Sequence, residues 1–593
     1  EKQFGSLPII ETQENKERIN KLGKEKQVLV LHRVRFIEPI DKELSDLRRN
    51  ISDESTATFR YDEFLKPPQL LDNIIERTIA FRDNSQSTFI FPKEQIMRYW
   101  NEERLLNLKP IDLDSVFERK FPLPDNELEI KKIHLLVTES GKGFNKYYRN
   151  HPHKDRVLQM LKKELTVICE QDFYEYFLII HDIFRYARQE NIQLSVRGSV
   201  VGSVLSRCLG FNEIDPTEYN LKFERFLNPY RNNKPDIDIE VPAFYHERIM
   251  TYIRKKYGEE NVAKIITYQS FGWKSSIEYL RKEEGITSKI EDYIPAGTKN
   301  VSYFFTTPRG KNVVKRYKQE GYLSILKKAK FLHKKVQSRS TQKASFVIDE
   351  RRQRLPVATI GGENVITFVR DNKHLESLAF TKVDLLPSRV LEVIYNTWSQ
   401  LTQSDREKYN FNDHKTYQLL REQNKDYVFQ LKSKGIHKVM EEINPRTLND
   451  IMLGLALYRP GPKEQQNKLY RNKMNKIYHL TDDNGNEIPD TDELTPILKE
   501  TFGIIIYQEQ VMEIAQVWSG FSLGEADLLR DAISKKKVNL MEKLKHSFFD
   551  RANSIGRSQE TTNYIFKLIE KFSEYGFGKS HAAEYATITY ETA

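Results

Sequence analysis

Cysteine is nearly absent from this chain: Cys169 and Cys208 are the only two among 593 residues. Two thiols can neither form a disulfide framework nor supply the ligands of a cysteine-rich zinc site. Both lie in apolar runs with helical spacing, so we expect two buried thiols that contribute packing alone. Such sparing use of cysteine is typical of a reducing compartment and predicts a cytoplasmic protein.

Long apolar runs and common nucleotide-binding motifs are also missing. No segment reaches the roughly 18–20 consecutive apolar residues that span a bilayer, and no signal peptide is visible. The glycine spacings of the Walker A loop and of the dinucleotide-binding fingerprint are absent, as are internal repeats and low-complexity tracts. The chain begins without Met and stops at Ala593 inside a helical pattern, which predicts further domains beyond both ends.

Positive charge exceeds negative charge by a modest margin, with 94 Lys and Arg against 84 Asp and Glu and a formal net charge of +10. Hydrophobic residues make up 39% of the chain, enough to build cores in several domains. A basic surplus favours a polyanionic partner. Many soluble proteins carry a similar surplus, so the partner has to be argued from motifs.

The order of predicted elements indicates a strand-rich region, interrupted by a helical insert and followed by a helical extension. Strands are predicted at 193–196, 262–268, 344–348, 365–369 and 378–384. Helices are predicted at 154–190, 200–209, 242–258 and through most of the chain after 387. Residues 273–343 are predicted to be helical and are heavily basic.

The most informative segment is Pro235-Asp236-Ile237-Asp238-Ile239. In an extended strand the two aspartates point to one face, while the two isoleucines can bury on the other. Carboxylates on one face repel each other unless a cation lies between them, and Mg²⁺ prefers such oxygen ligands. The segment therefore predicts a metal site; the alternative is a strand end with two solvated acids.

Arg197, Gly198 and Ser199 form a turn between a predicted strand and a predicted helix. Glycine lets the backbone approach a phosphate closely, and free N–H groups at a helix start favour an anion. Ser199 is expected to cap the helix and can also donate its hydroxyl group to a phosphate. The alternative is a plain strand–turn–helix connection in which the serine only caps.

A Gly-Ser turn followed by an acidic strand is the arrangement of nucleotidyltransferase palms, which need a third carboxylate for two metal ions. Asp384 is the best candidate, and Lys382 shares its face of the predicted strand. Lys382 would neutralise a phosphate while Asp384 binds metal; the alternative is an ordinary surface pair. Arg225 precedes the acidic strand and could reach phosphates; the alternative is that it is solvated or salt-bridged, as isolated arginines commonly are.

Further sequence blocks follow these in a fixed order. They are RGSVVGS at 197–203, DP at 215–216, FERFLNP at 223–229, PDIDI at 235–239, FQL at 429–431, ALYRPGP at 456–462, YQEQVM at 507–512, SLGEADLLR at 522–530 and KSHAA at 579–583. In this order they closely resemble the C-family DNA polymerases, the bacterial DNA polymerase III alpha subunits of the DnaE type. The resemblance covers about residues 154–593.

The resemblance implies an α+β multidomain fold. It has a nucleotidyltransferase-type (polymerase beta-like) mixed-sheet palm, a helical thumb and helical fingers. The implied domains are 1–60 as a partial polymerase-and-histidinol-phosphatase (PHP) remnant, 61–272 as linker helices and the first part of the palm, 273–343 as thumb, 344–389 as the second part of the palm, and 390–593 as C-terminally truncated fingers.

The resemblance also implies roles for single residues. Asp236, Asp238 and Asp384 match the family's metal-binding aspartates, which implies two Mg²⁺ ions, with Mn²⁺ as a substitute. Positions that handle the incoming nucleotide are matched by Arg197, Gly198, Ser199, Arg225, Lys382, Tyr458, Arg459 and Arg530. The basic thumb would bind DNA through phosphates, or it forms a solvated surface; its candidate residues are Lys327, Lys328, Lys334, Lys335 and Arg339. His581 matches a finger motif, and no role is assigned to it.

The implied partners are primer–template DNA and dNTPs. A sliding clamp and a clamp loader are expected to bind through regions outside this chain, no membrane is involved, and the cytoplasmic location becomes nucleoid-associated.

Two departures from the family pattern concern the phosphate site. Val196 stands where the family has Gly, and Asp531 stands where a second Arg is usual. Asp531 is expected to weaken triphosphate binding, with the lysines at 535–537 compensating for it. Lys343, Ala344 and Ser345 stand where the family has His-Ala-Gly.

A further departure concerns the N-terminal remnant. Arg33 and Arg35 stand where Asp and His would ligate metal, so we expect neither phosphoesterase nor proofreading activity from this part, and a structural role for His32.

Three functions remain open on this reasoning. The first is a template-directed DNA polymerase core. The second is a degenerate, non-catalytic protein of the same family that binds primer–template DNA, as Asp531 and Val196 would allow. The third is a different nucleotidyltransferase that adds nucleotides without a template.

Overall fold

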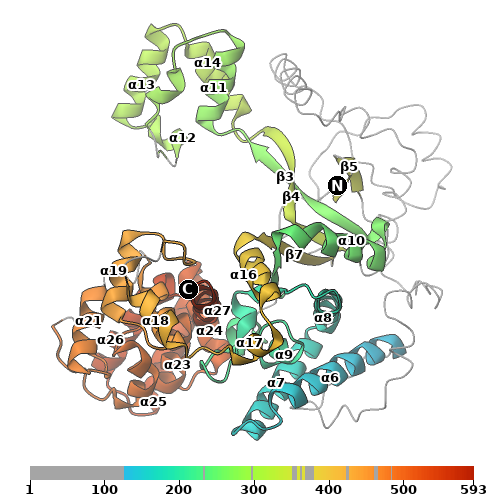
Figure 1. The fold of residues 1–593 in the computed structure, drawn as a ribbon. Coiled ribbons are helices and arrows are strands. Elements are labelled where there is room, and N and C mark those ends of the chain that lie inside the picture. The colour runs from blue at the N-terminus through green and yellow to red at the C-terminus, as the bar shows by residue number, and fades with distance from the viewer. Residues whose placement is uncertain are drawn as a thin grey trace, which may run out of the picture. The chain divides into compact units, whose positions relative to one another are not determined.

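The computed structural model of the chain (Figure 1) describes residues 126–230, 234–295, 298, 300–349, 357–360, 363–366, 380–422, 426–459, 465–482 and 484–593. The chain divides into two compact units. Of the described residues, those from Glu259 to Phe380 form one unit, called here the insert unit. Those up to Gly258 and from Thr381 to Ala593 form the other, called the main unit. The predicted PHP remnant at 1–60, with His32, Arg33 and Arg35, lies outside the described residues.

The main unit begins with a helical layer made of α6 (Glu127–Tyr147), α7 (Lys154–Glu170), α8 (Tyr174–Gln189) and α9 (Val204–Cys208). Helices α6 and α7 both contact α9. The apolar run in α8 is buried, with Phe177, Ile179 and Ile180 at 0% exposure. Cys169 and Cys208 are buried free thiols, so the prediction for both is confirmed.

Strand β2 (Asp238–Pro242) lies between β1 (Ser195–Arg197) and β7 (Thr381–Ser388). It pairs antiparallel with β1 and parallel with β7, so this part of the sheet is mixed. Alternation along the strands turns Val196, Ile239 and Leu385 to the interior, each fully buried. The same alternation leaves the polar side chains of β1, β2 and β7 on the opposite face.

The insert unit is built on a second group of strands. Strand β3 (Val262–Ser270) pairs antiparallel with β4 (Val336–Ile348) and parallel with β6 (Glu363–Ile366), and β5 (Val357–Ile360) pairs antiparallel with β6. Between β3 and β4 the chain forms α11 (Trp273–Glu283), α12 (Val301–Phe304), α13 (Pro308–Gln319) and α14 (Leu323–Leu332), which lie together in Figure 1. Their shared core includes Phe271, Ile277 and Tyr317.

The prediction that residues 273–343 are helical throughout is wrong at its C-terminal end. Helix α14 stops at Leu332, and Lys334 adopts a left-handed conformation with φ of 64°, which a continuing helix cannot contain. Residues from Val336 onward form β4, because the Val, Ser and Thr residues of this stretch pair with β3 over its length.

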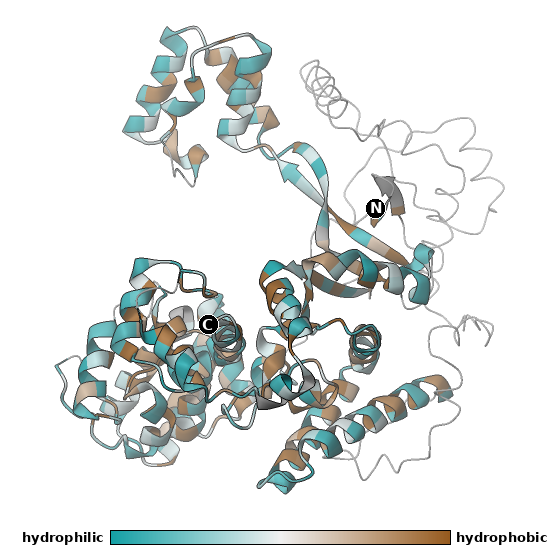
Figure 2. Ribbon diagram, in the orientation of Figure 1, coloured by the Kyte–Doolittle hydropathy of each residue, from teal (hydrophilic) through white to brown (hydrophobic). Residues whose placement is uncertain are grey.

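The C-terminal part of the main unit is helical, as predicted for the chain after 387. Its helices are α16 (Arg389–Gln400), α17 (Gln403–Lys408), α18 (His414–Arg421), α19 (Lys434–Ile443), α20 (Leu448–Leu457), α21 (Gln466–Asn475), α22 (Thr495–Leu498), α23 (Gln508–Ser519), α24 (Leu523–Ser534), α25 (Val538–Ser554), α26 (Gln559–Tyr575) and α27 (Lys579–Glu591). Figure 2 shows apolar and polar residues alternating along them, and the buried rings of Trp518, Phe521 and Phe566 belong to one core.

The predicted α+β class is confirmed at this level, as a mixed sheet with many helices. Within the described ranges, none of the helices combines the length and the apolar composition that crossing a bilayer requires.

Candidate metal and phosphate site

Three carboxyl groups meet on the polar face of β2 and β7. Asp236, Asp238 and Asp384 each offer an oxygen, and these oxygens all lie within 4.8 Å of one another. Among the residues that the structure describes, no other group of three or more His, Cys, Asp or Glu side chains is close enough to hold an ion. Side-chain exposure falls from 74% for Asp236 to 31% for Asp238 and 10% for Asp384, so the cluster reaches from solvent into the protein.

Strand register explains how Asp238 and Asp384, which are 146 positions apart, come together. In the parallel pair β2–β7, Asp238 is the direct partner of Asp384. In the antiparallel pair β1–β2, Arg197 is the direct partner of Asp238. Direct partners point to the same face of a sheet, so this register aligns a cation and two carboxyl groups in one row across three strands.

Two cationic side chains contact the carboxyl cluster. The Lys382 ammonium lies 2.5 Å from Asp384 Oδ2 and 3.4 Å from Asp236 Oδ1. The Arg197 guanidinium donates to Asp238 Oδ2 at 3.1 Å and to Glu240 Oε1 at 3.4 Å. The two cations therefore offset part of the repulsion among the acids.

The pKa shifts follow from this crowding. Burial raises the pKa of Asp238, and the charges of Asp236 and Asp384 add to the rise, while Arg197 opposes it. Burial alone would lower the pKa of Lys382, but its hydrogen bond to Asp384 and the two nearby carboxylate charges make the net shift upward. The cluster therefore stabilises the charged form of Lys382.

The donor set fits a hard divalent cation. All three candidate ligands are carboxylates, the oxygen ligands that Mg²⁺ and Mn²⁺ favour. Asp384 Oδ1 is buried and has no hydrogen-bond partner among the described residues. Burying a carboxylate oxygen without a partner is costly, and a bound cation removes that cost.

The predicted phosphate turn lies at the end of β1. Gly198 has φ of 89° and ψ of −149°, a region that is essentially restricted to glycine. A side chain at position 198 would meet open space, so the backbone conformation and not the packing requires glycine here. The Gly198 N–H donates to Glu584 Oε2 at 3.0 Å.

The expectation that Ser199 caps the following helix is wrong. Ser199 begins a short 3-10 helix, Ser199–Gly202, and α9 starts only after Ser203. The Ser203 side chain accepts from the N–H of Ser206 and is the cap. Its hydroxyl group in turn donates to the buried Glu164 at 2.7 Å. The residue that caps α9 is therefore Ser203 and not Ser199.

Tyr458 and Arg459 lie at the C-terminal end of α20. The Tyr458 hydroxyl group accepts from the Ser433 hydroxyl group at 2.7 Å, and the tyrosine is 38% exposed. The Arg459 guanidinium lies over the Phe577 ring, 4.3 Å from its centroid. Phe577 is a ring neighbour of His581, whose pKa the Arg459 charge helps to lower.

Arg530 and Arg225 each donate a hydrogen bond to a polar side chain of the main unit. Arg530 lies in α24, is 4% exposed and donates to Asp527 at 3.0 Å; in the described part of the chain it does not contact the carboxyl cluster. Arg225 donates to Gln508 at 2.8 Å at the start of α23.

Asp531 is largely neutralised by neighbouring lysines. Lys535 lies 2.9 Å and Lys537 3.0 Å from its two oxygens, while the Arg530 guanidinium is 3.9 Å away. Both lysines are thus engaged with Asp531 itself.

The basic residues of the predicted thumb lie in the insert unit. Lys327, Lys334, Lys335 and Arg339 are exposed, whereas Lys328 is half-buried and 3.6 Å from Glu284. Only Lys327 and Lys328 are in a helix; Arg339 belongs to β4, and the other two lysines precede it.

The sequence alone assigned no role at this site to several residues that the structure places there. The buried Tyr176 hydroxyl group of α8 accepts from the Ile237 N–H at 3.0 Å, directly between the two aspartates. Burial raises the pKa of Glu240 to about 7 and that of Glu584 to about 8. Burial and the charges of Arg459 and Arg197 lower the pKa of His581 to about 4, so this imidazole is neutral at pH 7. The spacing of residues could not predict these contacts, because the two residues in each contact are far apart in the sequence.

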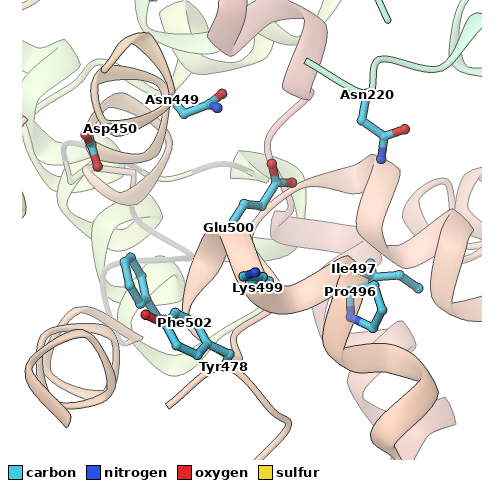
Figure 3. Close-up of a pocket in the computed structure, with 9 residues that line it drawn as sticks. All are labelled: Asn220, Asn449, Asp450, Tyr478, Pro496, Ile497, Lys499, Glu500 and Phe502. Carbon is cyan, nitrogen blue, oxygen red and sulfur yellow. The ribbon is translucent and has the colours of Figure 1, made fainter. Parts of the chain in front are cut away.

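A pocket in the main unit is lined by none of these residues. It encloses about 530 Å³ and is lined by Asn220, Asn449, Asp450, Tyr478, Pro496, Ile497, Lys499, Glu500 and Phe502 (Figure 3). The Tyr478 and Phe502 rings stack with centroids 5.8 Å apart, and Glu500 is paired with Lys579 at 2.7 Å. None of the lining residues belongs to the carboxyl cluster.

Fold and site together define a mixed α+β protein with a candidate divalent-metal site beside a glycine turn. Residues 134–387 match the family model of the bacterial DNA polymerase III alpha NTPase domain, and residues 389–556 match that of the bacterial DNA polymerase III alpha subunit finger domain. The chain belongs to the family of bacterial DNA polymerase III alpha subunits.

Two relatives give the measure of this similarity. The DNA polymerase III subunit alpha of Halalkalibacterium halodurans is 36% identical over 494 residues, which cover 80% of this chain and 42% of the relative. The DNA polymerase III subunit alpha of Staphylococcus aureus (strain COL) is 31% identical over 543 residues, which cover 87% of this chain and 50% of the relative. The chain spans about half the length of the curated relatives that it matches.

Proposed function

We propose that this chain is a template-directed DNA polymerase core that adds dNTPs to a primer 3′-hydroxyl group. The observation that carries the proposal is the register that sets Arg197, Asp238 and Asp384 side by side on three strands, with Asp236 and Lys382 in contact range. Family membership supplies the substrate class, since the relatives are named DNA polymerase III subunit alpha.

Asp236, Asp238 and Asp384 would hold two Mg²⁺ ions, or Mn²⁺ in their place, which would activate the primer hydroxyl group and neutralise the triphosphate. The primer oxygen forms its bond to the α-phosphorus as the bond to pyrophosphate breaks. Lys382, whose ammonium group contacts Asp384 and Asp236 here, would turn that group to a phosphate when these carboxylates hold metal. Arg197 keeps Asp238 oriented and ionised through its hydrogen bond.

The Gly198 turn and the Ser199 hydroxyl group are assigned to the phosphate tail. Arg225, Tyr458, Arg459 and Arg530 are assigned to the incoming nucleotide; for Arg530 this requires release from Asp527. The ion pairs of Asp531 with Lys535 and Lys537 offset its negative charge, which supports the catalytic proposal over the non-catalytic one.

The proposal also assigns domains. The strands β1, β2 and β7 belong to a palm of the nucleotidyltransferase type, the helices α11–α14 to a thumb, and the helices from α16 onward to fingers. Lys327, Lys328, Lys334, Lys335 and Arg339 are assigned to duplex phosphates, which gives binding without sequence preference. Primer–template DNA and dNTPs are the partners that this activity needs; contacts with a sliding clamp and a clamp loader, and a nucleoid-associated cytoplasmic location, stay predictions.

The test is primer extension by the Asp384→Ala protein. We expect extension to be abolished and the affinity for primer–template DNA to be unchanged, because position 384 would act on the metal and not on the duplex. The matched control is Asp155→Ala, an exposed acid in the first turn of α7. Normal extension by Asp384→Ala would refute the assignment.

The same assay separates the other functions. Tight, salt-sensitive DNA binding without extension by the unmodified protein would favour the non-catalytic alternative. Efficient addition of a single dNTP that does not match the template would favour the template-independent one.

A further inference from the structure

One main-chain donor of the glycine turn, the Gly198 N–H, is already occupied by a side chain of this protein. Glu584 of α27 accepts the Gly198 N–H through Oε2 at 3.0 Å. The two residues are 386 positions apart, and α27 contacts the 3-10 helix that follows the turn. Glu584 is 3% exposed, so this is an interior contact.

The surroundings of Glu584 do not provide a better partner. Its other oxygen, Oε1, is buried without a hydrogen-bond partner among the described residues. The nearest side chain with a titratable nitrogen is His581, with Nδ1 3.7 Å from Oε2, and this imidazole is neutral at pH 7 because its pKa is lowered to about 4 by burial and by Arg459 and Arg197. Arg197 itself donates to Asp238 and Glu240. The Gly198 N–H is thus the hydrogen-bond donor that Glu584 depends on.

An N–H group in a turn makes one strong hydrogen bond at a time. The Gly198 N–H is one of the main-chain donors that the glycine turn would offer to a nucleotide phosphate, and an oxygen of the Glu584 carboxyl group occupies it. A carboxyl group accepts a hydrogen bond whether it is ionised or neutral, so the contact persists through the neutral pH range.

We propose that Glu584 lowers the affinity for the incoming nucleotide by occupying the Gly198 N–H, so that a phosphate group has to displace it before it can use this donor. This inference rests on the proposed function of the site. Glu584 is an affinity-determining residue, and it takes no part in the bond-forming step.

The test is the KM for dNTP in primer extension by Glu584→Ala. We expect this KM to fall about tenfold, the effect of removing one competing hydrogen bond, with kcat within a factor of two or three. Glu584→Gln keeps an acceptor oxygen and is expected to stay close to the unmodified protein. Glu591→Ala is the matched control, because Glu591 is a half-buried acid on the same helix whose partner is Tyr409.

Glu584→Leu provides a second variant that fills the space without an acceptor, and it is expected to behave as Glu584→Ala does. A KM that rises in the Ala and Leu variants and is rescued in the Gln variant would show that Glu584 only supports the turn, and would overturn the proposal. An unchanged KM in both variants would overturn it as well.

A binding measurement keeps this inference separate from the proposed function. Calorimetric titration with inorganic tripolyphosphate and Mg²⁺ needs no primer extension. We expect about tenfold tighter binding by the Ala and Leu variants than by the unmodified protein, even if the latter did not extend primers. Equal affinities in a protein that does extend primers would reject the role of Glu584 and leave the proposed function standing.

Discussion

Replacing Lys382 with Met is expected to tighten the binding of Mg²⁺ to the protein in the absence of DNA and nucleotide. The ammonium group lies 2.5 Å from Asp384 and 3.4 Å from Asp236, so it holds the same carboxylates that a metal ion would use. Methionine has a similar length and no charge. A bound cation therefore no longer has to displace a competing positive charge.

The geometry sets an upper limit on the magnitude. At an effective dielectric constant of about 20, unit charges about 4 Å apart attract each other by about 4 kcal/mol. The Lys382 side chain is 29% exposed, so part of this attraction is lost to solvent and to the cost of desolvation. If about 1.4 kcal/mol of competition remains, the Kd for Mg²⁺ falls about tenfold in the variant.

The assay is calorimetric titration with Mg²⁺, together with thermal unfolding in EDTA and in excess Mg²⁺. In EDTA the variant should unfold at a lower temperature than the unmodified protein, because three carboxyl groups then face each other without the lysine. Mg²⁺ should raise its Tm by more than it raises that of the unmodified protein. Lys415→Met, at an exposed position of α18, is the control.

Unchanged or weaker Mg²⁺ binding by Lys382→Met would refute the reasoning that lysine and metal compete for the same oxygens. In primer extension the proposed function predicts the opposite trend, a higher KM for dNTP, because the ammonium group is assigned to a phosphate. Tighter metal binding combined with weaker nucleotide use is therefore the expected signature.

Two further predictions concern residues that support the site. Tyr176→Phe removes the acceptor of the buried Ile237 N–H. Urea unfolding should then show a free energy of unfolding lower by about 1–3 kcal/mol, and primer extension should need more Mg²⁺. An unchanged free energy of unfolding and an unchanged Mg²⁺ requirement would contradict this role. Burial raises the pKa of Glu164 to about 7. Between pH 4.5 and 7 the folded state therefore holds a proton on Glu164 that the unfolded state has released. The free energy of unfolding falls as the pH rises through this range, by up to about 3 kcal/mol. Glu164→Gln should flatten that decline in unfolding measured from pH 5 to 8, and an unaltered slope would contradict it.

The elements near the site were predictable to different degrees. The alternation in Pro235–Ile239 was enough to separate the two isoleucines, both fully buried, from the two aspartates. The helical character after 387 and the end of α10 (His246–Tyr257) before Gly258, whose φ is 93°, also followed from local patterns. The extent of β4 did not, because the pairing with β3 outweighs the helical appearance of a basic stretch.

The cap of α9 shows a second kind of limit. Ser199 and Ser203 both have a residue type that caps helices, and local sequence favoured the first. The buried carboxyl group of Glu164 binds the Ser203 hydroxyl group and the N–H groups of Val204 and Leu205. This long-range contact fixes where the helix begins.

The sequence by itself determined which side chains carry charge, which strand face they occupy and to which family the pattern is similar. These properties depend on residue type and on neighbours within a few positions, so a linear reading contains them. Tertiary structure alone decided that Lys382 bridges two of the acids, that Arg530 is tied to Asp527, and that Glu584 fills the turn at Gly198. Each of these depends on how a side chain is placed by the packing around it, which the order of residues does not state.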